Sequence, residues 1–302
     1  MDSQVTIIVF TSVLLALSQA FTFQSPENCK WRLQDGNKNK IALDCSIRTI
    51  NSDFDIFKFR SDQSEQITSI NVDCSDVFFF QSTMEPRAFQ SFYHLQQLDI
   101  QFCKFKSLPA GIFLGLDNMK SLTVRTHNSD WSAMALELIS NSLVGMPHLE
   151  SLDFGENNLW DLPERVFCPL PALRHLNLTA NRLQEVSKVG VVRGCGAHLV
   201  TLDLSANDLV ALPKAGLAGL KSLRELYLQY NKISILHDGA FVGLSALNVL
   251  NVSSNRLVAL PPDVFNETTG LQELYLQNNS LSVVALGLFC SSQSAHCIGY
   301  IC

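Results

Sequence analysis

The 302-residue sequence has little charge and lacks the patterns that catalysis and nucleic-acid binding require. Charged residues make up 17% of the chain and the formal net charge is −6, with no basic block or stripe. Nucleic acid is therefore a poor candidate partner, and nothing favours attraction to anionic lipid. The sequence has no nucleophile elbow, HExxH helix or phosphate-binding loop, so we expect no enzyme activity and no cofactor.

Long apolar runs are also missing beyond the N-terminus. Val5 to Leu17 is almost wholly apolar, but about 13 residues fall short of the ~20 that span a bilayer. Ser18-Gln19-Ala20 supplies the small residues that signal peptidase reads, so we expect residues 1–20 to be a secretory signal peptide rather than an anchor. No later segment is apolar for about 18 residues, and we expect no membrane insertion by this chain.

Self-similarity is the strongest pattern in the chain. The motif L-x-x-L-x-L-x-x-N-x-L is the leucine-rich-repeat signature, with looser copies at Leu95 and Met119 and a doubtful one at Ile67. The clear copies start at Leu149, Leu173, Leu199, Leu223, Leu247 and Leu271. Within each copy two leucines share one face of a short strand, and that face is buried only when coils stack. We predict an α/β leucine-rich-repeat solenoid, a horseshoe with a concave parallel sheet and an irregular, 3₁₀ or short-helix convex side.

An asparagine stands at the ninth position of every clear copy. The members of this ladder are Asn157, Asn181, Asn207, Asn231, Asn255 and Asn279. A buried amide both donates and accepts, so it can satisfy backbone groups where the strand turns away. The looser copies carry Cys103 and His127 there, and His127 marks an irregular coil.

Nine cysteines in an exported chain are disulfide candidates, with one left over. The expected pairs are Cys29 with Cys45, Cys168 with Cys195 and, more weakly, Cys74 with Cys103. Cys168 and Cys195 precede Leu173 and Leu199 by five and four residues, which puts them at similar places on adjacent coils. Cys103 has an alternative role as a buried ladder thiol. The sequence does not determine the pairing of Cys290, Cys297 and Cys302.

These features divide the chain into four parts. We expect a signal peptide at 1–20, a cysteine-containing N-terminal cap at 21–66, and leucine-rich repeats at 67–289. The repeats comprise about eight regular copies from Leu95 plus the doubtful one at Ile67. Residues 290–302 form a divergent tail in which no C-terminal cap is recognisable.

Several segments together resemble one family. They are Arg125-Thr-His-Asn-Ser-Asp-Trp131-Ser-Ala-Met134, Asn157-Asn-Leu-Trp160-Asp-Leu-Pro163, Phe167-Cys168-Pro169-Leu170, Leu176-Asn-Leu-Thr-Ala-Asn181, Cys195-Gly196 and Leu202-Asp-Leu-Ser-Ala-Asn207. This combination resembles the N-terminal ectodomain of invertebrate Toll receptors, in the long-ectodomain branch that includes Tollo and eighteen-wheeler. The Trp131 insertion and the placement of Cys168 and Cys195 are its most specific elements.

The resemblance implies a single-pass plasma-membrane receptor with many more repeats and a cytoplasmic TIR domain. It implies a Spätzle-like cystine-knot ligand or another cell-surface receptor as partner, leaves homo- and heterodimers open, and implies roles in innate immunity and development. The sequence departs from the family pattern after Phe289, so we expect a ligand-recognition part truncated before the span and TIR domain. The alternative is a free secreted decoy or cell-adhesion protein, and either would be extracellular.

Candidate contact and modification sites follow from the strand positions. We expect one outward column on the concave sheet, formed by Asp99, Thr123, Asp153, Asn177, Asp203, Tyr227, Asn251 and Tyr275. Tyr227, Tyr230 and Tyr275 are the best candidates for protein contact, although exposed aromatics are also common in strands. The sequons predict glycosylation at Asn177, Asn251, Asn266 and Asn278. Sugars at Asn177 and Asn251 would obstruct the concave face locally.

Overall fold

The computed structural model describes residues 25–34, 37–52, 54–58, 64–74, 81–127, 134–191 and 195–282. The expected signal peptide, the tail with its three cysteines, and Trp131 lie outside the described residues. Within the described residues, no helix is long and apolar enough to span a bilayer.

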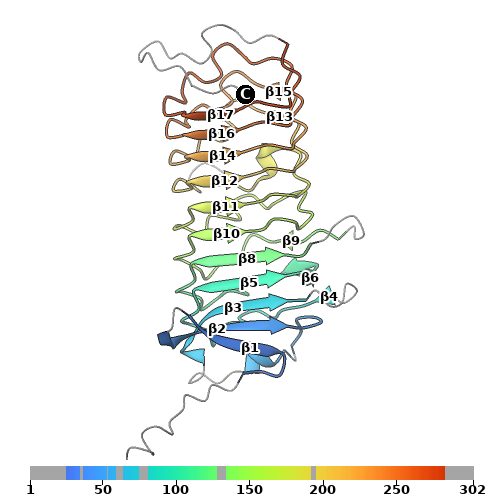
Figure 1. Ribbon diagram of the computed structural model, residues 1–302, viewed down its shortest axis with the longest axis vertical. Coiled ribbons are helices and arrows are strands. Elements are labelled where there is room, and N and C mark those ends of the chain that lie inside the picture. The colour runs from blue at the N-terminus through green and yellow to red at the C-terminus, as the bar shows by residue number, and fades with distance from the viewer. Residues whose placement is uncertain are drawn as a thin grey trace, which may run out of the picture.

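The chain winds into stacked coils, each of which contributes one strand to an 11-stranded sheet (Figure 1). In sheet order the strands are β1 (Cys29–Gln34), β2 (Asn37–Ser46), β3 (Ile67–Asp73), β5 (Gln97–Gln101), β8 (Ser121–Arg125), β10 (Ser151–Asp153), β11 (His175–Asn177), β12 (Thr201–Asp203), β14 (Glu225–Tyr227), β16 (Val249–Asn251) and β17 (Glu273–Tyr275). Only β1 and β2 are antiparallel; the remaining neighbours pair in parallel. The predicted solenoid fold is confirmed.

The return limbs of the coils are mostly irregular. Their regular pieces are the short parallel pairs β4 (Gln81–Ser82) with β6 (Lys104–Phe105), β7 (Ser107–Leu108) with β9 (Glu137–Leu138), and β13 (Ala211–Leu212) with β15 (Ile235–Leu236). Two 3₁₀ helices, η1 (Asp55–Lys58) and η2 (Val186–Lys188), complete the described elements. The side opposite the main sheet therefore contains little helix.

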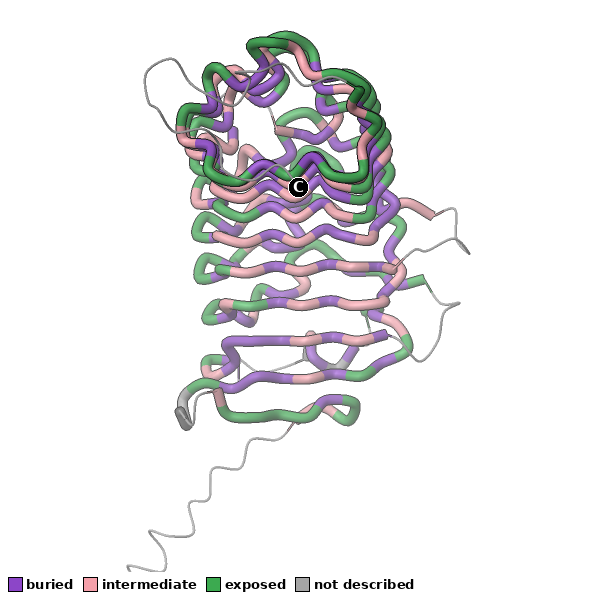
Figure 2. The backbone as a smooth tube through the Cα atoms, turned by 45° about the horizontal axis from the view of Figure 1, so that its top comes forward, coloured by how far each residue is buried: buried purple, intermediate pink, exposed green. Residues whose placement is uncertain are grey.

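Period-two alternation builds the core. Leu226 and Leu228 are fully buried, while Tyr227 between them remains partly exposed. Figure 2 shows this alternation of buried and partly exposed residues along the stacked strands. On the return side, Phe241 and Phe265 of successive coils are buried and stack with their ring centroids 5.8 Å apart. Each coil thus buries its apolar residues against its neighbours, as a repeat array requires.

The ladder asparagines connect adjacent coils. Asn207 is 5% exposed, and its Nδ2 donates to the carbonyl oxygens of Leu178, Leu204 and Ser205 at 2.9, 3.1 and 3.1 Å. Its Oδ1 accepts the backbone N–H of Leu183 at 3.0 Å. One amide therefore satisfies backbone groups in its own coil and in the preceding coil, as its buried position demands.

The ladder is interrupted where the sequence is irregular. Cys103 is disulfide-bonded to Cys74, so the alternative of a buried free thiol is not what the structure shows. His127 has φ 47° and is partly exposed, with its ring stacked on Phe102 at 3.9 Å. The ring of His127 therefore lies outside the core. The backbone N–H of Thr126 donates to Oδ1 of Asn157 on the next coil at 2.9 Å.

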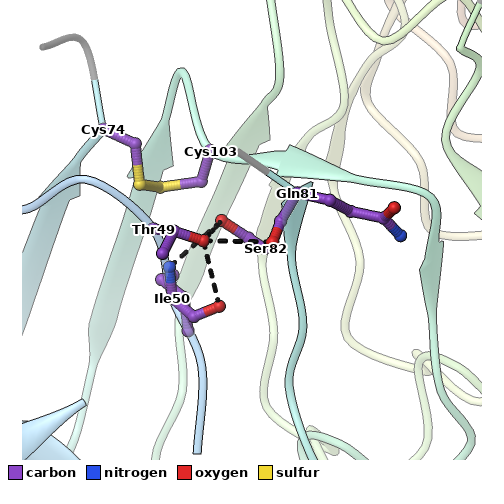
Figure 3. Close-up of a disulfide and its surroundings, with 6 residues drawn as sticks. All are labelled: Thr49, Ile50, Cys74, Gln81, Ser82 and Cys103. Carbon is purple, nitrogen blue, oxygen red and sulfur yellow. Dashed lines mark hydrogen bonds between the residues drawn. A yellow bond between two sulfur atoms is a disulfide. The ribbon is translucent and has the colours of Figure 1, made fainter. Parts of the chain in front are cut away.

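Disulfides and side-chain bonds hold the N-terminal hairpin and the first coils together. Cys29 and Cys45 face each other across β1 and β2. Figure 3 shows the Cys74–Cys103 bridge beside a second link between segments that are distant in the sequence, in which Thr49 Oγ1 and Ser82 Oγ lie 3.1 Å apart. The buried Ser82 hydroxyl also accepts the N–H of Ile50 at 3.1 Å. Farther along, Cys168 is bonded to Cys195, with Cα atoms 4.9 Å apart.

Candidate protein-binding surface

The solvent-facing side of the main sheet, which we call the sheet face, contains the expected column of residues. Cross-strand register places in one line Asp99, Thr123, Asp153, Asn177, Asp203, Tyr227, Asn251 and Tyr275. Asn71 of β3 extends the column toward the hairpin. Because parallel strands lie ~4.8 Å apart, residues two coils apart in this column are separated by about 10 Å.

Two of the three candidate tyrosines share this column. Tyr227 and Tyr275 flank Asn251, and each hydroxyl donates to a glutamate on its own strand, Glu225 at 3.5 Å and Glu273 at 2.7 Å. Burial and the nearby carboxylates raise the pKa of Tyr227, so its phenol stays protonated. Tyr230 lies elsewhere, on the turn after β14 with φ 58°, and is 67% exposed. Tyr227 and Tyr275 therefore lie in the same column of the sheet face, and Tyr230 lies outside it.

Negative charge dominates the sheet face. From β3 to β17, the carboxylates that point outward are Asp73, Asp99, Asp153, Asp203, Glu225 and Glu273. Arg125 is the only arginine or lysine that these described strands of the main sheet contain. The surface therefore complements a partner that presents positive charge.

Arg125 is already neutralised within the face. Its Nη2 and Nε donate to the two carboxylate oxygens of Asp153 at 2.5 and 3.1 Å, and its Nη1 donates to Glu156 at 3.2 Å. The hydrogen bond to Asp153 is the largest cause of the raised pKa of Arg125, and the charges of Asp153, Glu156 and Asp99 also raise it, against the opposing effect of burial. His127 Nδ1 lies 2.5 Å from Glu156, and Asn177 Nδ2 donates to Asp153 at 3.0 Å. The sequence reasoning missed this network, because the 30-residue repeat hides that Arg125 and Asp153 lie on adjacent coils.

A groove of about 540 Å³ lies at the hairpin end of the sheet face. Its charged lining consists of Glu27, Lys30, Asp44, Asp73 and Asp99. Across the described residues, no group of three or more His, Cys, Asp or Glu side chains is arranged to hold a metal ion. Four of the five charged side chains that line the groove are acidic, so the groove is negatively charged.

The surroundings of Asp99 raise the pKa of its carboxyl group above the ordinary value. Burial is the largest cause of its raised pKa, and the charges of Asp153 and Asp73 raise the pKa further. A hydrogen bond from Gln101 Nε2 at 2.7 Å and the charge of Arg125 oppose the increase. The folded surface thus holds this carboxylate in an environment that disfavours its charge.

The four sequon asparagines occupy different environments. Asn177 and Asn251 are partly buried in the column of the sheet face, whereas Asn266 and Asn278 are exposed. Asn251 Oδ1 accepts the N–H of Ser253 at 3.0 Å, so its amide orientation is fixed against the strand end. Glycosylation of all four residues stays a prediction.

Comparison with known proteins agrees with this geometry. A family model described as leucine rich repeat matches residues 136–183, 197–257 and 245–294. The crystal structure of a TLR13–ssRNA13 complex superposes with a TM-score of 0.62 at 22% identity, covering 74% of this chain and 31% of that one. A Leptospira interrogans LRR protein gives 0.54 at 20% identity, covering 81% and 62%. The chain is a leucine-rich-repeat solenoid.

A curated relative adds information about the type of protein. Toll-like receptor 7 of Drosophila melanogaster is 35% identical over 171 residues, which is 56% of this chain and 11% of the relative. The chain therefore spans about a tenth of that relative's length. This homology supports a Toll-like leucine-rich-repeat ectodomain and points to a non-enzymatic recognition module. Together with the disulfides, it suggests an extracellular or secretory location.

Proposed function

We propose that this chain is the ligand-recognition part of a Toll-like receptor and that the sheet face binds an extracellular protein. The observation that carries the proposal is the column in which Tyr227 and Tyr275 stand on an acidic, solvent-facing sheet. Tyrosines anchor protein interfaces because they bury a large area at a low cost in rotamer entropy. The proposed partner presents basic and apolar groups, and a Spätzle-like cystine-knot protein or another cell-surface receptor is the candidate class.

The organisation of the chain belongs to the same proposal. Residues 1–20 would be removed as a signal peptide, 21–66 would cap the solenoid, and 67–289 would form the recognition array. The parent receptor would belong to the long-ectodomain branch of Tollo and eighteen-wheeler, with signalling roles in immunity or development. The antiparallel hairpin at the sheet edge and the homology to a Toll-like receptor support this reading.

Nucleic acid is the main competing ligand class. The TLR13 neighbour carries ssRNA13 in its crystal structure, so this type of fold is compatible with RNA. From β3 to β17 the sheet face presents six carboxylates and a single arginine, and this stretch therefore repels a phosphate backbone. We therefore favour a protein ligand and include RNA in the test.

The decisive experiment measures binding of the immobilised, secreted chain to recombinant Spätzle-like cystine-knot proteins by biolayer interferometry. Tyr227→Ala is expected to weaken binding by roughly tenfold or more. Tyr93→Ala is the control, because Tyr93 is also accessible to solvent, at 37% exposed, but lies outside the strands of the main sheet. Equal losses for both variants, or tighter binding of single-stranded RNA than of any of these proteins, would refute the proposal.

A further inference from the structure

Asn251 is a sequon asparagine with an aromatic side chain on either side of it. Cross-strand register places Tyr227 of β14 and Tyr275 of β17 directly beside it, one coil before and one coil after. Tyr275 is 40% exposed and Tyr227 is partly exposed. Because adjacent strands lie ~4.8 Å apart, any group attached to the Asn251 amide begins between the two phenol rings.

The amide of Asn251 is oriented for modification. Its Oδ1 accepts the backbone N–H of Ser253 at 3.0 Å and the Ser253 hydroxyl at 2.7 Å. Among the described residues its Nδ2 has no hydrogen-bond partner, and this atom is accessible to solvent. The oxygen is thus held against the strand end, and the nitrogen, which is the atom that carries an N-linked sugar, remains available on the sheet face.

The two tyrosine rings are held in the same orientation. Each hydroxyl donates to the glutamate two residues earlier on its own strand, Glu225 on β14 and Glu273 on β17. Both rings therefore lean along their strands in the same direction, on the two sides of β16. Between the two glutamates lies Val249, the outward residue of β16, which is partly exposed. The surface next to Asn251 thus offers a phenol ring on each side and an aliphatic side chain below.

We propose that Asn251 carries an N-linked glycan whose first N-acetylglucosamine packs between Tyr227 and Tyr275, over Val249. A lipid-linked oligosaccharide of the secretory pathway supplies the sugar: its C1–diphosphate bond breaks, C1 bonds to Nδ2, and the lipid diphosphate and one amide proton leave. A sugar midway between the tyrosines lies about 5 Å from each ring, within the roughly 4.5–7 Å at which rings are in contact. Its C–H groups then meet the negative faces of the phenols.

The polar groups nearby suit a neutral, hydroxyl-rich ligand. In the described chain, Oε1 of Glu225 and Oε1 of Glu273 have no hydrogen-bond partner, so each can accept a sugar hydroxyl. A neutral sugar is also free of the repulsion that an acidic group would meet beside these carboxylates. The same place therefore provides stacking surfaces and hydrogen-bond acceptors for one sugar.

Other sequons lack these neighbours. In the column, Asn177 lies between Asp153 and Asp203, and its Nδ2 donates to Asp153 at 3.0 Å. Asn266 is exposed outside the strands of the main sheet, and its Nδ2 donates to Asp263 at 2.8 Å. Neither position places a sugar between two tyrosines, so the packing distinguishes Asn251 from both.

The packed sugar also defines where a protein ligand can lie. It covers the side of each ring that faces Asn251 and leaves open the side of Tyr227 that faces Asp203. In the recognition role, which rests on the proposed function, ligand contact is then confined to Tyr227 and the coils before it. The packing itself does not depend on a ligand.

Nuclear magnetic resonance of the secreted chain tests the packing. The chain is produced with oligomannose glycans and trimmed by an endoglycosidase to one N-acetylglucosamine at each occupied sequon. Peptide mapping should find this sugar on Asn251. Its protons should show Overhauser contacts to the rings of Tyr227 and Tyr275, with upfield ring-current shifts, and Tyr275→Ala should remove the contacts to that ring.

Enzymatic release of the untrimmed glycans from the native protein provides a second readout. A peptide-N-glycosidase should release the Asn251 glycan roughly tenfold more slowly from wild type than from the double variant Tyr227→Ala/Tyr275→Ala, because two ring contacts must first break. Release at Asn266 should be the same in both proteins. Tyr93→Ala, outside the main sheet, should leave both rates unchanged. Circular dichroism confirms that each variant is folded.

An unmodified Asn251, or a sugar without contact to either ring, overturns the proposal. So does a release rate at Asn251 that does not respond to the double substitution. Binding of the cystine-knot proteins is measured separately. A packed sugar without a bound ligand therefore refutes only the proposed function, and a bound ligand beside an unpacked sugar refutes only the packing.

Discussion

Replacing Asn207 by alanine tests how the ladder stabilises the solenoid. The side chain makes four hydrogen bonds, three as a donor and one as an acceptor, at distances from 2.9 to 3.1 Å. Counting four lost bonds would predict a very large loss of stability. The surrounding bonds show that this count is too high.

The three carbonyl oxygens each retain another donor after the substitution. Leu178 O still accepts from Asn181, Leu204 O from Asn231, and Ser205 O from the N–H of residue 180. The N–H of Leu183 has Asn207 as its only acceptor among the described residues, and Leu183 is fully buried. The substitution therefore leaves the buried N–H of Leu183 without an acceptor, which lowers the unfolding free energy by about 1–3 kcal/mol.

Urea denaturation combined with hydrogen exchange measures both consequences. Asn207→Ala should destabilise the chain by about 2 kcal/mol and accelerate exchange of the Leu183 amide. Asn207→Leu, which also leaves no room for a replacement water, should cost at least as much. Asn279→Ala is the matched comparison, because Asn279 makes the same type of bonds but is partly exposed, so its loss should be smaller. Equal losses at Asn207 and Asn279, with Leu183 still protected, would refute this account.

Three further predictions concern other features of the chain. Asn251→Gln should remove one glycan in intact-mass spectrometry of the secreted protein and strengthen ligand binding at Tyr227, whereas an unmodified Asn251 peptide from wild type would contradict this. Serine at both Cys168 and Cys195 should lower the unfolding free energy by about 3–4 kcal/mol in urea, because the bridge closes a loop of 27 residues. Asp99→Asn should raise the melting temperature by an amount that grows between the ordinary Asp pKa of 3.8 and the raised folded-state pKa and is constant above it, since burial raises the folded-state pKa and ionisation then opposes folding. An Asp99→Asn effect that does not vary with pH would show that burial does not control this carboxyl group.

The fold was predictable because its signal is repeated. A single L-x-L strand is weak evidence, but copies in register specify both the buried face and the direction of stacking. The sequence also placed Tyr227 and Tyr275 in one column, because side chains on a strand alternate with period two. The repeat pattern therefore predicts which residues of successive coils lie in the same column of the sheet.

The hydrogen bonds of Arg125 to Asp153 and Glu156 could not be predicted from the repeat pattern in the same way. Its coil is longer than the others, so the sequence offset between Arg125 and Asp153 differs from the regular spacing. His127 occupies a ladder position, yet its ring turns out to Phe102 and Gln101. These contacts depend on how the side chains of one irregular coil pack, and the repeat pattern does not predict that packing.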